Sequence, residues 1–388
     1  MMKKTVFLSL MILLLGAASA AGVGGCTGQK APPSSLPNLS APNMISPDFR
    51  RADGPREWSF PADYGAHPAY QTEWWYYTGN LETAGGRQFG YQLTLFRRGI
   101  LPPDQIPARD SAWSAEEIYM GHLALTDAAG REHHGFEKFS RGAAGLAGAR
   151  SDPFAVWLEH WEIREIGPET YQVRAGAGDI HIDLILKNRK GLTFHGQNGF
   201  SQKGSQPGNA SYYFSQTRLA TRGEVQASGI SHQVSGLSWM DHEFSTSVLS
   251  PNQVGWDWFS IQLDEGTDLM TFQIRRQDGS VDPYSSGTLI EPSGSTRHLD
   301  QDDFTITVTD TWRSPRTGAD YPAGWVVEVP AADLSLRIVP VLPDQEMNVS
   351  YVYWEGAVRV EGQISGQVVE GKGYAELTGY LESMAGEF

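Results

Sequence analysis

The sequence predicts an all-β protein made of two tandem antiparallel β-barrels, and three observations support this prediction. Short runs of alternating, aromatic or β-branched residues recur regularly between Gly, Asp, Asn and Pro, which is typical of sandwiches and barrels. Helical periodicity is nearly absent after the first residues. Residues 58–388, which remain after the expected leader and tether, are too many for one small barrel, because globular domains contain roughly 100–200 residues.

The expected strands follow one another along the whole mature part of the chain. Each is a run of β-branched, aromatic or alternating residues that ends at turn-forming residues. The clearest runs are residues 73–78, 89–96, 119–126, 180–186, 212–219, 257–263, 304–309, 325–329, 351–360 and 373–381.

The chain also contains an internal repeat. Residues 74–81 (WWYYTGNL) align with residues 256–263 (WDWFSIQL), with large aromatic residues at the first, third and fourth positions and Leu at the eighth. Each segment is followed by a Gly-containing turn and a second strand that ends in a doubled arginine, at 97–98 and 275–276. Because the whole hairpin recurs in order, we interpret it as a duplication in which each copy begins one barrel. The domain boundary is then expected near Gly236.

The first residues have the order of a lipoprotein signal peptide. Lys3 and Lys4 precede an apolar run that is too short to span a bilayer as a helix, and small residues follow it. The sequence VGGC at 23–26 is typical of the site that lipoprotein signal peptidases cleave, and Cys26 is the only cysteine. We therefore expect Cys26 to be acylated. The alternative is ordinary cleavage after residues 18–20 (ASA), which leaves Cys26 as an idle thiol.

These features divide the chain into four parts. Residues 1–26 are the expected signal peptide, and residues 27–57, rich in Pro, Ser, Ala and Asn, are the expected tether. Residues 58–236 and 237–388 are the two expected barrel domains. The protein is therefore predicted to be lipid-anchored in the cell envelope, where it faces the periplasm or the outside.

Composition and missing motifs exclude several classes of function. The chain has 30 basic and 45 acidic residues and a net charge of −15, whereas nucleic-acid binding depends on neutralising phosphates. It contains no Gly-x-Ser-x-Gly elbow, no His-Glu-x-x-His, no cysteine pair and no nucleotide-binding glycine loop. We expect neither a metal nor a cofactor. Its 12 Trp residues can build large cores and still line a cavity.

The densest polar set, residues 238–243 (SWMDHE), is the candidate catalytic cluster. In a strand, Trp239, Asp241 and Glu243 share one face, with neighbours roughly 6.5–7 Å apart. Two carboxylates that close, beside an indole and away from water, raise one pKa, and a protonated carboxyl can act as a general acid. We expect Asp241 to be the donor, with His242 or Glu243 setting its pKa. The alternative is a solvated linker with ordinary salt bridges.

The aromatic run at residues 73–77 supplies candidate ligand-binding residues. Alternation places Glu73, Trp75 and Tyr77 on one face of the strand and Trp74 and Tyr76 on the other. One face is therefore expected to line a cavity or a second interface, although core filling explains the Trp residues equally well. Buried Glu73 needs a partner, for which the arginines at 97–98 are candidates.

Four further residues are candidate ligand-binding residues: His122, Trp239, Trp256 and Trp258. Trp256 and Trp258 belong to the internal repeat, and Trp239 belongs to the acidic cluster at residues 238–243. His122 lies within an apolar strand, where a lone His is more often a hydrogen-bonded core residue than a functional one.

Together these stretches resemble the family of carotenoid 1,2-hydratases and AttH-like lipoproteins. The resemblance covers the chain from about residue 58 to its end and implies two lipocalin-like (calycin-type) barrels packed side by side, which agrees with the duplication. The matching stretches are residues 73–80 (EWWYYTGN), 121–127 (GHLALTD), 211–218 (SYYFSQTR), 236–244 (GLSWMDHEF), 255–260 (GWDWFS) and 353–357 (YWEGA).

The resemblance implies two branches of function. Hydratases protonate a terminal double bond of a polyene, with an acidic side chain as donor and aromatic faces that stabilise the cation. The secreted lipoproteins, often associated with export systems, are commonly described as predicted hydrolases, and the signal peptide favours this branch. In the hydratases a Tyr-x-Asp unit after the Trp-rich hairpin contributes the acid, whereas residues 272–274 (FQI) contain no carboxylate.

We therefore expect a membrane-tethered protein that binds a hydrophobic small molecule, lipid or isoprenoid-like. The alternatives are a hydratase-type lyase that uses Asp241 or Glu243 as the acid, a secreted hydrolase, and a structural accessory of an envelope transporter. The expected partners are the ligand, the membrane and an ABC-type export system, and nucleic acid is not expected.

Overall fold

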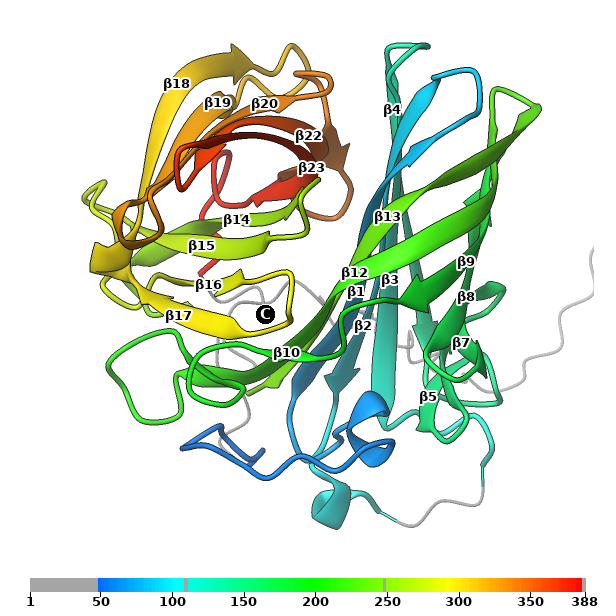
Figure 1. Cartoon of the computed structure of the whole chain (residues 1–388). Coiled ribbons are helices and arrows are strands. Elements are labelled where there is room, and N and C mark those ends of the chain that lie inside the picture. The colour runs from blue at the N-terminus through cyan, green and yellow to red at the C-terminus, as the bar shows by residue number, and fades with distance from the viewer. Residues whose placement is uncertain (1–47, 108–110, 247–248, 386–388) are drawn as a thin grey trace, which may run out of the picture. The chain divides into compact units, whose positions relative to one another are not determined.

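The computed structural model describes residues 48–107, 111–246 and 249–385 (Figure 1). Antiparallel strands build this part of the chain, which confirms the all-β prediction. In the same segments, no helix has the length and hydropathy needed to cross a bilayer. Cys26, the expected signal peptide and most of the expected tether lie outside the described residues. The helical elements described are η1 (Ala62–Tyr64), η2 (Pro103–Gln105), η3 (Gln301–Asp303) and η4 (Pro330–Ala332).

The first sheet has 13 described strands and curls on itself (Figure 1). Its order is β4-β3-β2-β1-β13-β12-β9-β8-β7-β6-β5, and β10 and β11 pair with β12. The strands are β1 (Thr72–Glu82), β2 (Gln88–Gly99), β3 (Glu117–Asp127), β4 (Glu132–Arg141), β5 (Ala147–Ser151), β6 (Phe154–Leu158), β7 (Trp161–Gly167), β8 (Thr170–Ala177), β9 (Ile180–Asn188), β10 (Thr193–Phe194), β11 (Phe200–Gln202), β12 (Ala210–Ala227) and β13 (Ile230–Ser245).

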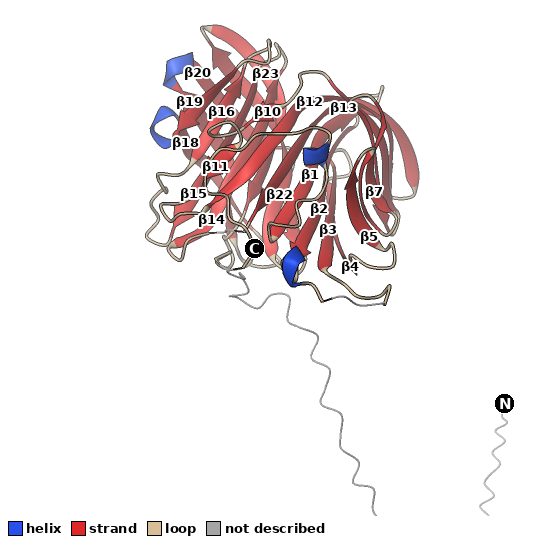
Figure 2. Ribbon diagram, turned by 90° about the horizontal axis from the view of Figure 1, so that it is seen from below, coloured by secondary structure: helices blue, strands red, loops and turns tan. Residues whose placement is uncertain are grey.

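The second sheet has 10 described strands and also curls, so that both sheets appear as curved walls in Figure 2. Its order is β17-β16-β15-β14-β23-β22-β20-β19-β18, and β21 pairs with β22. The strands are β14 (Gln253–Leu263), β15 (Asp268–Arg276), β16 (Ser286–Ile290), β17 (Thr296–Asp300), β18 (Thr305–Arg313), β19 (Asp320–Val329), β20 (Leu334–Pro340), β21 (Glu346–Asn348), β22 (Val352–Ile364) and β23 (Gln367–Leu377).

The two sheets share one plan, as the repeat predicts. β1 pairs with β2 on one side and with β13 on the other, and β14 pairs with β15 and β23 in the same way. The aligned segments 74–81 and 256–263 lie on β1 and β14. In each sheet a later hairpin, β12–β13 or β22–β23, returns to pair with the first strand. The duplicated hairpin therefore begins both barrels.

The chain passes from one sheet to the other later than expected. Gly236 pairs with Leu81 of β1, and β13 continues to Ser245. The expected boundary near Gly236 thus falls inside a strand of the first sheet, and the second sheet begins with Gln253 of β14. The first barrel needs all of β13, because this strand returns to β1. The candidate cluster 238–243 consequently belongs to the first barrel.

Strand alternation separates two environments on β1. Trp75 and Tyr77 are buried in the core of the first barrel, whereas Tyr76 packs in a second cluster with Trp239 and Trp258. Because Trp258 comes from β14, this cluster joins the two sheets. The prediction that the faces of residues 73–77 serve different purposes is confirmed.

Asp268 on β15 is fully buried and links the two sheets. Its carboxylate accepts hydrogen bonds from Lys190 Nζ at 2.8 Å, Arg218 Nη2 at 2.5 Å and Thr217 Oγ1 at 2.8 Å. Gln262 Nε2 on β14 also donates to the carbonyl of Thr217 at 2.6 Å. Buried charges are tolerated when they are paired in this way. The network therefore fixes the position of β15 of the second sheet against residues of the first sheet.

Candidate functional site

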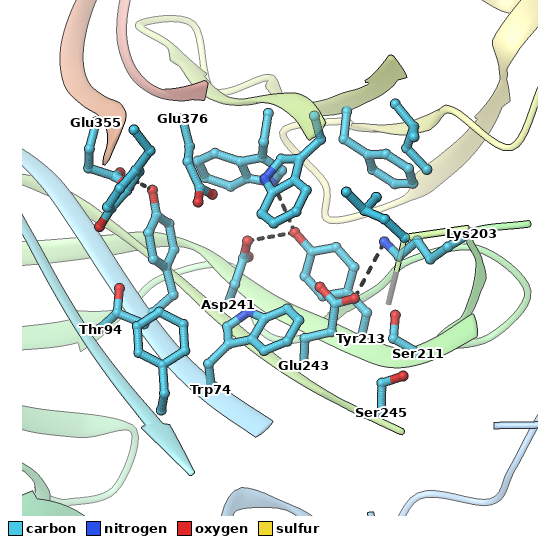
Figure 3. A pocket seen from close by; sticks show the side chains of 18 of the residues that line it. Trp74, Thr94, Lys203, Ser211, Tyr213, Asp241, Glu243, Ser245, Glu355 and Glu376 are labelled. Carbon is cyan, nitrogen blue, oxygen red and sulfur yellow. Dashed lines mark hydrogen bonds and ion pairs between the residues drawn. The ribbon is translucent and has the colours of Figure 1, made fainter. Parts of the chain in front are cut away.

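A pocket lies between the two sheets (Figure 3). Its empty volume is about 1050 Å³, which includes space open to solvent, and nine of its lining residues are aromatic. Apolar walls with a few converging polar groups are typical of small-molecule sites. The lining residues are Trp74, Tyr76, Thr94, Phe96, Lys203, Ser211, Tyr213, Asp241, Glu243, Ser245, Leu249, Trp256, Trp258, Phe272, Ile274, Tyr351, Tyr353, Glu355 and Glu376.

The Asp241 carboxyl is buried in this pocket and held by three donors. Tyr213 Oη donates to Oδ2 at 2.5 Å, Trp239 Nε1 donates to Oδ1 at 2.6 Å, and Ser215 Oγ donates to the same Oδ1. Trp258 of the second sheet donates through Nε1 to Tyr213 Oη at 3.1 Å. Desolvation raises the pKa of Asp241 to about 7, although the hydrogen bonds lower it. Near neutral pH the protonated and ionised forms of Asp241 are therefore both populated.

Two more carboxyl groups face the pocket from the second sheet (Figure 3). Desolvation raises the pKa of Glu376 to about 7, and the negative charge of Asp241 contributes to the rise. Desolvation and the charge of Glu376 raise the pKa of Glu355 well above its usual value, although Tyr76 Oη donates to Glu355 Oε1 at 2.5 Å. Burial therefore favours the protonated form of Glu355, whose buried Oε2 has no hydrogen-bond partner among the described residues.

Asp241 and Glu376 occupy equivalent positions in the duplicated fold. Asp241 on β13 lies opposite Tyr76 of β1, and Glu376 on β23 lies opposite Trp258 of β14. Tyr76 and Trp258 are both the third residue of the aligned repeat. Each barrel thus places one carboxyl in the pocket, and two carboxyls with a pKa near neutrality can supply one acid and one base.

Lys203 and Glu243 form a polar group at the edge of the pocket (Figure 3). Lys203 Nζ lies 3.4 Å from Glu243 Oε1. The same ammonium lies 3.9 Å from the ring centroid of Phe272 and 5.3 Å from that of Tyr213. A cation so placed can hold an anionic or hydrogen-bond-accepting end of a ligand whose apolar part lies among the rings.

Ser215 connects Asp241 to a buried histidine. Ser215 Oγ lies 2.6 Å from His195 Nε2, and His195 Nδ1 lies 2.9 Å from Thr288 Oγ1 of the second sheet. Desolvation lowers the pKa of His195 well below its usual value, so the imidazole is neutral. It orients the Ser215 hydroxyl toward Asp241 without adding a positive charge that would ionise that carboxyl.

The family model described as AttH-like matches residues 51–380, which include both barrels and all residues that line the pocket. This chain belongs to the AttH-like family. The resemblance to AttH-like proteins is thereby confirmed. No curated protein matches the sequence.

Solved structures agree with this membership. An AttH protein from Nitrosomonas europaea is 36% identical, with a TM-score of 0.76, and the match covers 86% of this chain and all of that one. Kievitone hydratase from Nectria haematococca is 13% identical, with a TM-score of 0.64 over 86% of this chain and 98% of that chain. At that identity the second likeness shows the fold alone. The predicted fold of tandem lipocalin-like barrels is confirmed for this AttH-like chain.

The structure brings six of the predicted site residues together in the pocket: Trp74, Tyr76, Asp241, Glu243, Trp256 and Trp258. Two others lie behind its wall. The Trp239 indole donates to Asp241, and its ring centroid lies 6.4 Å from that of Trp258. His122 is fully buried, with Nδ1 2.8 Å from Tyr353 Oη and Nε2 3.1 Å from Glu137 Oε1. His122 therefore positions the lining residue Tyr353.

His242 lies on the opposite face of β13, inside the first barrel. Its Nε2 is 2.8 Å from Glu73 Oε1, and its ring centroid lies 4.9 Å from that of Trp75. Successive side chains of a strand point to opposite faces, so His242 does not set the pKa of Asp241 through contact. Burial and the three donors to Asp241 set its pKa, and the negative charge of Glu243 contributes to the rise, so of the two expected residues Glu243 has this role and His242 does not.

His67, Glu73 and His242 place three ligand atoms within 4.8 Å of one another. Both histidines contact Glu73 Oε1, and Arg97 Nε donates to Glu73 Oε2 at 2.8 Å. The predicted pairing of Glu73 with one of the two arginines is confirmed. Because a guanidinium on the carboxylate disfavours a second cation there, we interpret this group as a buried ion-pair network.

Sequence reasoning missed five residues of the site: Lys203, Tyr213, Ser215, Glu355 and Glu376. Tyr213 and Ser215 belong to the stretch 211–218 and Glu355 to the stretch 353–357, both of which carry the family resemblance. Their chemistry was not assigned because it depends on contacts with other strands. Tyr213 and Ser215 of β12 contact Asp241 of β13 in the same sheet, and Glu355 contacts Tyr76 across the two sheets. The signal for Glu376 is the duplication itself, which places it where Asp241 stands in the other barrel.

Proposed function

We propose that this AttH-like chain binds a hydrophobic or amphipathic small molecule in the pocket between its sheets. The observation that carries the proposal is the lining, which combines nine aromatic side chains with a few buried polar groups. Aromatic faces bury a large apolar area, and the polar groups fix the orientation of a ligand. Lys203 at the edge suits a ligand with one polar end, such as a lipid or an isoprenoid-like molecule.

The Trp256→Ala variant should retain about tenfold less of the ligand that co-purifies with the protein. Trp256 is a partly exposed lining residue, and truncation of such an aromatic contact costs about 1–2 kcal/mol, where about 1.4 kcal/mol is tenfold in affinity. The measurement is mass spectrometry of the organic extract from equal amounts of purified protein. Trp157→Ala is the matched control, because Trp157 is partly exposed on β6 outside this pocket. Equal ligand in the parent and Trp256→Ala would contradict the proposed site.

Acid-catalysed hydration of a carbon–carbon double bond is the second candidate function, favoured by the buried Asp241 carboxyl. Asp241 would give its proton to one carbon, which leaves a positive charge on the other. Water would bond to that cation and lose a proton to a carboxylate, for which Glu376 is the candidate. The indoles of Trp74, Trp256 and Trp258 offer ring faces that stabilise a cation.

The missing carboxylate at residues 272–274 does not remove this possibility. Phe272 and Ile274 line the pocket, and Asp241, Glu355 and Glu376 bring acids to it from β13, β22 and β23. One solved structure of the same fold is a kievitone hydratase, which supports hydration as a chemistry of the fold. Hydrolysis has less support, since Ser215 Oγ is fully buried and occupied by Asp241 and His195.

The proposed location is the cell envelope, with a lipid anchor at Cys26 and an ABC-type export system as the proposed protein partner. The Cys26→Ser variant should remain in the exported fraction and no longer partition into detergent. Stable anchoring takes more than one acyl chain, which mature lipoproteins carry on this cysteine. The measurement is detergent phase partition of the parent and the variant, and equal partition would show that Cys26 is not the anchor.

A further inference from the structure

We propose that the end of the first barrel at which the pocket opens is a membrane-binding face. Its contact residues are Ile100, Leu101 and Trp113, which we call the apolar loop. The pocket would then receive its ligand directly from the bilayer, so the ligand class is a membrane-dissolved amphiphile. The face can be tested without a ligand, whereas the entry route rests on the proposed binding function.

The pocket opens toward the end of β1 that contains Thr72. On β1, Trp74 is partly exposed, whereas Tyr76, one step further from Thr72, is buried. On β2, Phe96 is partly exposed, whereas Thr94 is buried, and β2 runs antiparallel to β1. Because exposure increases toward the same end on both strands, the mouth lies at that end of the sheet.

The apolar loop lies at the same end. Ile100 follows β2 directly, and its backbone nitrogen donates to the carbonyl of Glu116 at 2.9 Å. The exposed fractions of Ile100, Leu101 and Trp113 are 42%, 39% and 62%. All three follow β2 within the loop that leads to β3, and exposed Trp and aliphatic side chains on one loop are typical of surfaces that enter the boundary between lipid headgroups and acyl chains.

The described chain also begins at this end. Phe49 is buried against the last residue of β2, where a Cβ on Gly99 would lie 2.7 Å from the Phe49 ring. The 21 residues at 27–47 separate this point from Cys26 and can span at most about 75 Å when fully extended. The described chain, which continues N-terminally toward Cys26, therefore begins at the same end of the first barrel as the mouth and the apolar loop.

The described residues of the loop, 100–107 and 111–117, contain the acidic Asp104, Glu116 and Glu117 and no basic side chain, so charge does not attract the loop to anionic lipids. The first ten described residues carry equal numbers of acidic and basic side chains: Asp48, Arg50, Arg51, Asp53, Arg56 and Glu57. Binding through Arg or Lys to anionic lipids would weaken strongly with salt, because surface charges are screened. Binding through the apolar loop should change little between low and high salt.

The test uses residues 26–388 with Cys26→Ser and vesicles of phosphatidylethanolamine and phosphatidylglycerol. The protein should sediment with the vesicles, and Ile100→Ser/Leu101→Ser/Trp113→Ser should lower the bound fraction about tenfold, because it removes the apolar area that enters the lipid. The matched control is Ile230→Ser/Val368→Ser, at residues that are 58% and 87% exposed, and it should bind as the parent does. Equal binding of the parent and the loop variant, or no binding of either, would overturn the proposal.

One further variant separates this proposal from the pocket's function. Trp256→Ala changes a pocket residue outside the apolar loop, so it should bind vesicles as the parent does although it retains less ligand. If the protein binds vesicles but never carries a ligand, the proposed ligand-binding function is wrong, whereas the membrane-binding face is supported. Retained ligand without vesicle binding would overturn the face alone. A loop variant that keeps vesicle binding but loses a co-purifying envelope protein would show a protein-docking loop and overturn the membrane proposal.

Discussion

Asp241→Asn should lower the rate of hydration about 10²–10⁴-fold and leave ligand affinity within a few-fold. Asn has the shape of Asp and keeps one oxygen as an acceptor for Trp239 and Ser215, but it has no proton to give. The rate is measured as the mass gain of one water on the alkene recovered from the protein, and affinity is measured by titration of the same compound. Full activity of Asp241→Asn on a confirmed substrate would end the proposal for this acid.

Asp257→Asn is the matched control for this experiment. Asp257 is buried on β14 between two pocket residues of that strand, but its carboxylate points away from the pocket and pairs with Arg275 at 3.1 Å. A folded Asp257→Asn protein should therefore keep the parent rate. Loss of rate in both variants would indicate a general effect of losing a buried carboxylate.

The pH dependence of the rate gives a second test. The donor Asp241 must be protonated, so the rate should fall as pH rises through its pKa of about 7. The acceptor Glu376 must be ionised, so the rate should also fall as pH drops through its pKa of about 7. The profile is then a bell centred near 7. Glu376→Gln should remove the acidic limb, and an unchanged profile in that variant would assign the base elsewhere.

Much of the fold followed from local pattern. The alternation at residues 73–77 predicted that Trp75 and Tyr77 face one way and Trp74 and Tyr76 the other, and the structure shows this division. The repeat located the first strand of each barrel. It did not reveal the end of the first barrel, because β13 returns to β1 by pairing across a long sequence separation, and no local signal marks that return.

The sequence identified site residues one strand at a time, on β1, β13 and β14, but it did not show how these strands meet. Period-two alternation placed Trp239, Asp241 and Glu243 on one face, and the same rule already placed His242 on the other. Glu355 and Glu376 reach the pocket from the second sheet, and their nearness to Asp241 depends on how the two sheets pack. Sequence alone could show that the carboxyls exist but not that burial would raise their pKa values together.

Glu73→Gln should lower the free energy of unfolding by about 3–5 kcal/mol, which is the usual cost of breaking a buried ion pair by removing one partner. Glu73 and Arg97 are both fully buried, and among the described residues the one anionic partner left to Arg97 would be Glu117, which is partly exposed and lies at 3.0 Å. The measurement is urea unfolding of the parent and the variant. The double variant Glu73→Gln/Arg97→Met removes both charges and should recover part of the loss. A cost below about 1 kcal/mol would show that the pair is not structurally important.

The cost of Glu73→Gln should also depend on pH in a defined way. Desolvation alone would raise the pKa of Glu73, but the charges of His67 and Arg97 lower it well below its usual 4.5. The ionised carboxylate therefore contributes to the free energy of unfolding above pH 4.5, and this contribution is lost in acid. Desolvation would lower the pKa of His67, but Glu73 and Asp63 raise it above 6.5. The charged imidazole therefore contributes fully to the free energy of unfolding below pH 6.5, and this contribution decreases as the pH rises. The destabilisation should therefore be largest between about pH 4.5 and 6.5. Above that range Arg97 still pairs with the carboxylate, so Glu73→Gln should still lower the free energy of unfolding, but by less. In acid the parent and the variant should have the same free energy of unfolding.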